Sequence, residues 1–265
     1  MSAPTPQEAT PRSRETAPAP APAPARAPPG DRSAEWFVPR FGPARFRLMV
    51  GLLFLPYTGM VIAYTVLGAL LAPRVAWDRV AALALVYFLG LGIGAHALDA
   101  LGSKGVKPWG RAFSRARLRA LAAGSLTLAY AIGLYYIVRH VPWLAPVAVL
   151  EGFFVFAYNL EWFGGRFHTD GWFAFSWGLL PVLAGELMQT NQVSAAGLLL
   201  GAGAALLSRV EITASRPYKA LKRRPDPLAP EERDVLVRYE TVLRSVSLGV
   251  LLLALGLLLG RLWAG

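Results

Sequence analysis

The sequence contains no cysteine, and only 16% of its 265 residues are charged. The absence of cysteine excludes a disulfide framework, a thiolate metal site and a cysteine nucleophile. The charged fraction is well below the roughly 25% that is typical of a soluble domain. Hydrophobic residues instead make up 55% of the chain, and several apolar runs reach the roughly 20 residues that cross a bilayer. The composition therefore predicts an all-α, polytopic membrane helix bundle.

Acidic residues are also scarce, since 16 Asp and Glu stand against 27 Lys and Arg, which gives a net charge of +11. A strongly basic chain can indicate nucleic-acid binding. Here, however, the basic residues fall in segments between apolar runs. In such segments they set membrane topology and contact anionic lipid headgroups. We therefore expect membrane lipid as a partner and no nucleic acid.

The chain divides into an N-terminal tail and a helical domain. Residues 1–33 are rich in alternating Ala and Pro, a composition that favours a disordered, extended tail over a packed core. Residues 34–265 form the predicted transmembrane domain. About seven helices are expected there, at 48–72, 79–101, 118–138, 144–160, 172–190, 194–207 (or on to Ile212) and 242–263. Pro56 lies inside the first of these and is expected to kink it.

The distribution of Lys and Arg orients these helices. The segments 102–119 and 209–240, together with the flank before the first helix, carry most of the basic residues. The alternate connections carry few. Because basic loops stay in the cytoplasm, this alternation predicts a multi-pass protein with a cytoplasmic N-terminus.

The stretch 87–114 carries the most conspicuous polar groups. Its glycine-rich helix, with Gly90, Gly92 and Gly94, is expected to let a neighbouring helix approach closely. His96 and Asp99 follow on one face, and a cluster of cations comes next: Lys104, Lys107 and Arg111. Ionisable groups at membrane depth are candidates for a functional site. The alternatives to a functional site are that Asp99 forms an ion pair with Lys104 or an arginine, and that the cations serve only to set the membrane topology.

Further polar groups lie in or beside the later helices. Glu151 and Glu186 fall within apolar runs, so each is expected to have a polar partner or a water-filled cavity. Tyr158, Asn159 and Glu161 lie at the predicted cytoplasmic end of the fourth helix. They could form part of a functional site, or they could simply belong to an interfacial belt of polar and aromatic residues.

Three stretches together resemble the UbiA-type intramembrane prenyltransferases. The first is HALD, residues 96–99, followed by KPWGRAFS, residues 107–114, at the position of that family's first acidic motif and the phrase after it. The second is residues 156–190, which look like the family's fifth-helix region. The third is SRVEITASRPYKALKR, residues 208–223, where a second acidic motif usually falls. The resemblance covers roughly residues 45–225.

The resemblance implies an Mg²⁺-dependent enzyme that transfers an isoprenoid chain from a prenyl diphosphate to a lipophilic acceptor. In that family, acidic motifs hold Mg²⁺, which neutralises the leaving diphosphate. In this sequence the resemblance assigns Asp99 and Glu211 as catalytic residues and metal ligands. The residues it assigns to substrate binding are His96, Lys104, Lys107, Arg111, Tyr158, Asn159 and Glu161.

The sequence departs from the family pattern in both acidic motifs. Ser103 or Lys104 stands where a later acid is expected in the first, and Ala214, Ser215 and Arg216 stand where one is expected in the second. The family also usually has about nine helices. These departures motivate an alternative: a non-catalytic protein of UbiA-like fold that binds a polyprenyl lipid or a protein partner without needing Mg²⁺.

Overall fold

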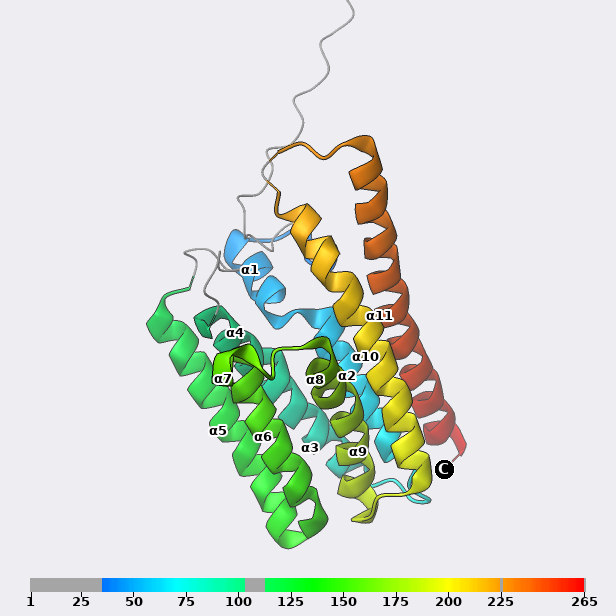
Figure 1. The fold of residues 1–265 in the computed structure, drawn as a ribbon. Helices are drawn as coiled ribbons and strands as arrows, with labels where there is room; N and C mark the ends of the chain where they lie inside the picture. The colour runs from blue at the N-terminus through cyan, green and yellow to red at the C-terminus, as the bar shows by residue number, and fades with distance from the viewer. Residues whose placement is uncertain (1–34, 103–112, 225, 265) are drawn as a thin grey trace, which may run out of the picture.

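The structure is a computed structural model, and it describes residues 35–102, 113–224 and 226–264. Every regular element in these residues is helical, which confirms the all-α prediction. Figure 1 shows the long helices running alongside one another as a bundle, with α5 and α6 on one flank and α10 and α11 on the other. The predicted disordered tail, residues 1–33, lies outside the described residues.

All seven predicted ranges are helical, although several are interrupted. The first range comprises α1 (Ala44–Leu53) and α2 (Leu55–Ala69), and the second comprises α3 (Trp77–Tyr87), the π-helical segment η2 (Phe88–Ala95) and α4 (His96–Gly102). The middle elements are α5 (Arg115–Arg139), the short 3₁₀ turn η3 (Pro142–Leu144), α6 (Ala145–Asn159) and the turn α7 (Trp162–Gly165). The last are α8 (Asp170–Ala174), the π-helical η4 (Phe175–Leu179), α9 (Leu180–Thr190), α10 (Ala195–Lys222) and α11 (Pro230–Ala264).

Five helices of the described chain are long and apolar enough to cross a membrane, or six if the bent pair α1 and α2 is counted as one span. The five are Trp77–Gly102, Arg115–Arg139, Asp170–Thr190, Ala195–Lys222 and Pro230–Trp263. The remaining predicted helix, α6, has 15 residues. A bilayer core needs about 20 residues in a helix, so α6 is short for a complete span.

The bend between α1 and α2 lies where the sequence places Pro56. The two helices differ in direction by 42°, and Phe54 between them adopts a left-handed conformation, with φ at 42°. Proline has no N–H to donate and cannot continue the hydrogen-bond ladder. Across the break, the Thr58 hydroxyl donates to the Leu53 carbonyl at 2.6 Å. The predicted kink is therefore confirmed, and it turns the Phe54 ring towards the interior.

Polar side chains cap the helices that begin at the loops. Ser114, Thr169 and Ser194 each accept a hydrogen bond from a backbone N–H in the first turn of α5, α8 and α10, as N-cap residues commonly do. Buried Glu186 accepts from the Ser194 backbone N–H at 3.2 Å with both carboxylate oxygens. The polar partner predicted for Glu186 is therefore the backbone N–H of Ser194, at the start of the next long helix.

Glycines set the closest helix contacts in the bundle. A Cβ on Gly68 of α2 would lie 2.0 Å from the Val182 carbonyl oxygen of α9, and one on Gly185 of α9 would lie 2.0 Å from the Thr65 carbonyl oxygen of α2. The two backbones therefore touch, as small residues permit in membranes.

The glycines of η2 behave as predicted at two of three positions. A Cβ on Gly92 would meet Thr58 at 2.8 Å, and one on Gly94 would meet Leu126 at 2.9 Å, whereas one on Gly90 would have ordinary clearance. The segment η2, which leads into α4 and Asp99, is therefore held closely against α2 and α5.

One end of the bundle gathers the end of α4, the start of α5 and the end of α10 (Figure 1). The segment before α1 docks at this end as well. There the Tyr218 hydroxyl donates to the Glu35 carboxylate at 2.8 Å, and Lys222 forms an ion pair with Glu35 at 3.3 Å. His96 and Asp99 of α4 lie at this end, close to the last turns of α10.

Candidate functional site

A cavity of about 270 Å³ opens at this end, between α2, α4, α6, α8 and α10. Its lining combines rings and charges. The rings come from Phe54, Tyr57, Tyr158, Phe173, Trp177 and two histidines, and the charges come from Asp99, Arg216, Lys219 and Arg223. The elements concerned are far apart in sequence, so the site exists only in the folded bundle.

Aromatic rings form a continuous wall. Phe54 stacks on Tyr57 with ring centroids 4.4 Å apart, and Phe173 stacks on Trp177 at 5.1 Å. Edge contacts join the two pairs through Tyr57 and Phe173 at 5.7 Å, and through His96, which lies 5.8 Å from Phe54 and 5.7 Å from Trp177. Interlocked rings of this kind hold their positions and present both faces and edges to a ligand.

The opposite wall is the cationic face of α10. Ile212, Arg216, Lys219 and Arg223 follow at spacings of four, three and four residues, which places them on one stripe of a helix. The Lys219 ammonium lies 4.9 Å from the Phe54 ring centroid and 5.7 Å from that of Tyr57, close enough for cation–π attraction. Arg216 forms an ion pair with Asp170 at 2.7 Å.

Two histidines and one amide complete the polar lining, and local backbone bonds fix their orientation. His96 Nδ1 lies 3.0 Å from the Gly92 carbonyl oxygen, and His168 Nδ1 lies 2.9 Å from the Tyr158 carbonyl oxygen. Asn159 donates to the Val155 carbonyl at 2.8 Å. The Tyr158 ring stacks on His168 at 4.3 Å, so the loop 160–169 is folded back against α6.

The cavity brings together four of the residues predicted from the sequence: His96, Asp99, Tyr158 and Asn159. Glu161 is not among the lining residues. It stands at the start of α7 with φ at 53°, beyond the end of α6. Lys104, Lys107 and Arg111 lie outside the described residues.

Glu211 occupies a different place from the one its predicted role requires. It is 1% exposed and accepts a hydrogen bond from the Ser247 hydroxyl of α11 at 3.0 Å. It borders a void of about 10 Å³ that shares Tyr57, Phe173 and Trp177 with the cavity, and it is not among the residues that line the cavity holding Asp99. Tyr57 lines both the cavity and this void. Its hydroxyl donates to the Glu211 backbone carbonyl at 3.3 Å.

This placement does not fit a magnesium site shared by Asp99 and Glu211. Mg²⁺ in proteins is typically held by one or two carboxylates together with phosphate and water, in a tight octahedral shell. Across residues 35–102, 113–224 and 226–264, no group of three or more His, Asp or Glu side chains could hold a metal ion. We therefore derive no chemical step through Mg²⁺.

Three cations and one carboxylate instead give the described lining an excess of positive charge. Arg and Lys side chains bind phosphate through charge-assisted hydrogen bonds, Arg as a planar fork and Lys as a point charge. Arg216, Lys219 and Arg223 were not among the predicted site residues, because the family resemblance places acidic residues in the stretch 208–223. Their i, i+3, i+7 spacing on an amphipathic helix end was the signal that would have identified them.

No protein-family model matches the chain, and no curated protein and no solved structure matches it either.

Proposed function

We propose that this chain is a multi-pass membrane protein of UbiA-like architecture that binds a prenyl diphosphate, with the diphosphate in the 270 Å³ cavity. The observation that carries the proposal is the cationic stripe of α10, Arg216, Lys219 and Arg223, facing a wall of aromatic rings. The cations complement the phosphate charge, and the rings complement the first isoprene units of the chain. This pairing of surfaces suits a molecule that is anionic at one end and hydrocarbon at the other.

The topology supports the same reading. In our proposal all seven helical segments enter the membrane, with α6 as the shortest, and the cavity faces the cytoplasm. Arg115, Arg117 and Arg119 open α5 at the same end as the basic end of α10. The opposite end carries few cations, among them Arg74, Arg79 and Arg139. The positive-inside rule therefore favours a cytoplasmic N-terminus and cytoplasmic access to the cavity.

In this proposal, protein cations take the place that Mg²⁺ has in the UbiA-type enzymes. The support is that Asp99 lines the cavity whereas Glu211 does not, together with the three cations in the cavity lining. Binding is then independent of divalent metal. This favours the lipid-binding form of the function over the Mg²⁺-dependent transferase.

Prenyl transfer is a second candidate, and the aromatic wall favours it. In that reaction the allylic C–O bond breaks and its electron pair leaves with the diphosphate. The acceptor's nucleophile then bonds to the allylic carbon and loses a proton. Aromatic faces stabilise a neighbouring cation, and Asp99 is the carboxylate that lines the described part of the cavity, where it is placed to accept the proton. The lipophilic acceptor would enter from the membrane.

The test is a thermal-shift titration of the purified full chain with geranylgeranyl diphosphate and with geranylgeraniol. A ligand that binds only the native state raises the Tm by mass action. We expect a concentration-dependent rise with the diphosphate, at least about tenfold weaker binding of the alcohol, and the same result in EDTA. A shift that appears only with added Mg²⁺ would contradict the proposal.

Transfer is tested separately by incubating the protein with labelled geranylgeranyl diphosphate and a membrane lipid extract. If the protein is a transferase, we expect the native protein to form labelled product and Asp99→Asn to form none. Both proteins should bind the diphosphate equally well. Binding without product in either protein leaves the lipid-binding function alone.

A further inference from the structure

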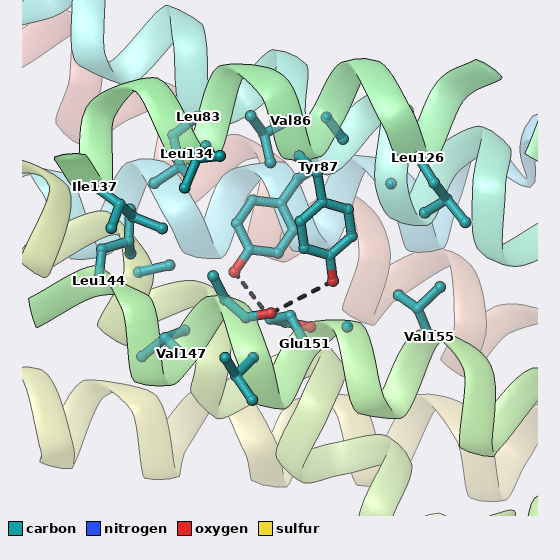
Figure 2. A pocket seen from close by; sticks show the side chains of 18 of the residues that line it. Leu83, Val86, Tyr87, Leu126, Leu134, Ile137, Leu144, Val147, Glu151 and Val155 are labelled. Carbon is teal, nitrogen blue, oxygen red and sulfur yellow. Dashed lines mark hydrogen bonds between the residues drawn. The ribbon is translucent and has the colours of Figure 1, made fainter. Parts of the chain in front are cut away.

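A second, larger cavity lies elsewhere in the bundle. It has a volume of about 470 Å³, lies between α3 with η2, α5 and α6, and opens to the surface (Figure 2). The volume is within the range of roughly 300–1,000 Å³ found for small-molecule pockets. Leucine, valine, isoleucine, alanine and glycine make up most of its lining, and it shares no residue with the cationic cavity. It is therefore a separate site.

One carboxyl group lies in this hydrocarbon setting. Glu151 projects from α6, and its Oε1 accepts a hydrogen bond from the Tyr87 hydroxyl of α3 at 2.9 Å, as Figure 2 shows. Its Oε2 is buried and has no hydrogen-bond partner in the described chain. No Lys, Arg or His is among the residues that line the cavity. An unsatisfied carboxyl oxygen away from water costs free energy, so this atom points to a ligand.

We propose that this cavity binds a lipophilic molecule that carries a single hydroxyl group, a long-chain alcohol or phenol, with the hydroxyl on Glu151 Oε2. The apolar lining selects the hydrocarbon part. The hydroxyl is selected because it both donates and accepts: it satisfies Oε2 whether Glu151 is ionised or protonated. An ammonium group, which only donates, would serve only the ionised form, and a carbonyl, which only accepts, would serve only the protonated form.

The rim of the cavity indicates how such a molecule enters. Leu134 of α5 and Val149 of α6 line the cavity and are 59% and 71% exposed. On a membrane protein these side chains face lipid, so the ligand enters sideways from the bilayer. Along α6, Glu151 lies seven residues from Tyr158 of the cationic cavity, about 10 Å at 1.5 Å per residue. The two sites therefore lie at different depths.

The experiment compares 4-nonylphenol with its methyl ether, 4-nonylanisole, on the full chain in detergent, by thermal-shift titration. The two probes have nearly the same apolar body, and only the phenol can donate to Oε2. We expect the native protein to bind the phenol at least about tenfold more tightly, and Glu151→Leu to bind both probes equally. Equal binding of the two probes by the native protein would overturn the proposal.

A steric variant keeps the proposal testable if Glu151→Leu fails to fold. A Cβ added at Gly133 of α5, which lines the cavity, meets nothing within 4 Å, so Gly133→Leu adds its side chain at the cavity with open space around its Cβ. The matched control is Gly124→Leu on the same helix, where a Cβ also meets nothing and the residue is outside the cavity. We expect Gly133→Leu to lose phenol binding and Gly124→Leu to keep it. Unchanged binding in Gly133→Leu would show that the probe binds elsewhere.

This site does not depend on the cationic cavity. Loss of geranylgeranyl diphosphate binding with retained phenol binding would refute the proposed function alone. The reverse pattern would refute this inference alone.

Discussion

Replacing Lys219 by glutamine removes one positive charge from the middle of the cationic stripe. Its ammonium lies over the Phe54 ring at 4.9 Å, between Arg216 and Arg223 on the same face of α10. Glutamine keeps much of the side-chain length and the ability to hydrogen-bond. The substitution therefore tests the charge at this position.

The size of the effect follows from the electrostatics of a half-buried site. Two unit charges about 4 Å apart attract by about 4 kcal/mol at an effective dielectric constant of 20. Loss of hydration offsets part of this, and net values for hydrogen bonds to charged groups are about 1.5–3 kcal/mol. Each 1.4 kcal/mol changes affinity about tenfold. We therefore expect Lys219→Gln to weaken binding of geranylgeranyl diphosphate about 10- to 100-fold.

Lys222→Gln is the matched control, since it makes the same change three residues further along α10. Lys222 forms ion pairs with Glu35 at 3.3 Å and Glu240 at 3.9 Å, and it does not line the cavity. Isothermal titration calorimetry in detergent should show affinity within about threefold of native for this variant, although its Tm falls slightly. Equal weakening in both variants, or in neither, would refute the reasoning.

Three further predictions concern the metal, the salt and the packing. Glu211→Gln should leave diphosphate affinity, measured by calorimetry, within about twofold of native, because Glu211 accepts a hydrogen bond from Ser247 and does not line the cavity. A loss of affinity of about tenfold or more would instead support the role of Glu211 as a metal ligand. Raising the salt from 0.05 M to 0.5 M should weaken binding of the diphosphate, since salt screens exposed charges, and should leave 4-nonylphenol binding unchanged. Gly185→Ala should destabilise the fold by about 1–3 kcal/mol or more, because its Cβ would lie 2.0 Å from the Thr65 carbonyl oxygen. Gly124→Ala, where a Cβ meets nothing within 4 Å, should not destabilise the fold. Thermal melting curves of the two variants test this difference.

The helices could be read from the sequence because apolar runs and basic loops are local signals. The seven predicted ranges are helical, and the bend falls where Pro56 interrupts the backbone ladder. The π-helical segments η2 and η4 were not predicted. Glycines in both segments lie close to other helices: Gly92 and Gly94 of η2 lie against Thr58 and Leu126, and Gly178 of η4 lies against Ala205. Such contacts between helices are not a property of the local sequence.

The site was only partly predictable, for the same physical reason. His96 and Asp99 are neighbours on one helix face, so their shared place in the cavity follows from spacing. Glu211 lies on the helix that was expected to face them, but on a stripe directed towards Ser247. Which stripe faces the cavity depends on how α10 is rotated against α2 and α11, and the sequence alone does not set that rotation.

The pairing of Glu151 with Tyr87 was likewise only partly predictable from the sequence. A polar partner or a water-filled cavity was predicted for Glu151 because a carboxyl group within an apolar helix needs one. The structure gives it the partner, a hydroxyl from α3, beside an apolar cavity between α5 and α6. The partner lies 64 residues away in the chain, so no local pattern could name it.

The most direct test of the central claim is photo-crosslinking with a geranylgeranyl diphosphate analogue that carries a diazirine on its first isoprene unit, in EDTA, with the labelled peptides identified by mass spectrometry. We predict labelling around Phe54 and Tyr57 and along Ile212 to Arg223, suppressed by excess geranylgeranyl diphosphate. Labelling confined to the lipid-facing surfaces of α5 and α11, and unaffected by that competitor, would contradict the proposal that this cavity holds a prenyl diphosphate.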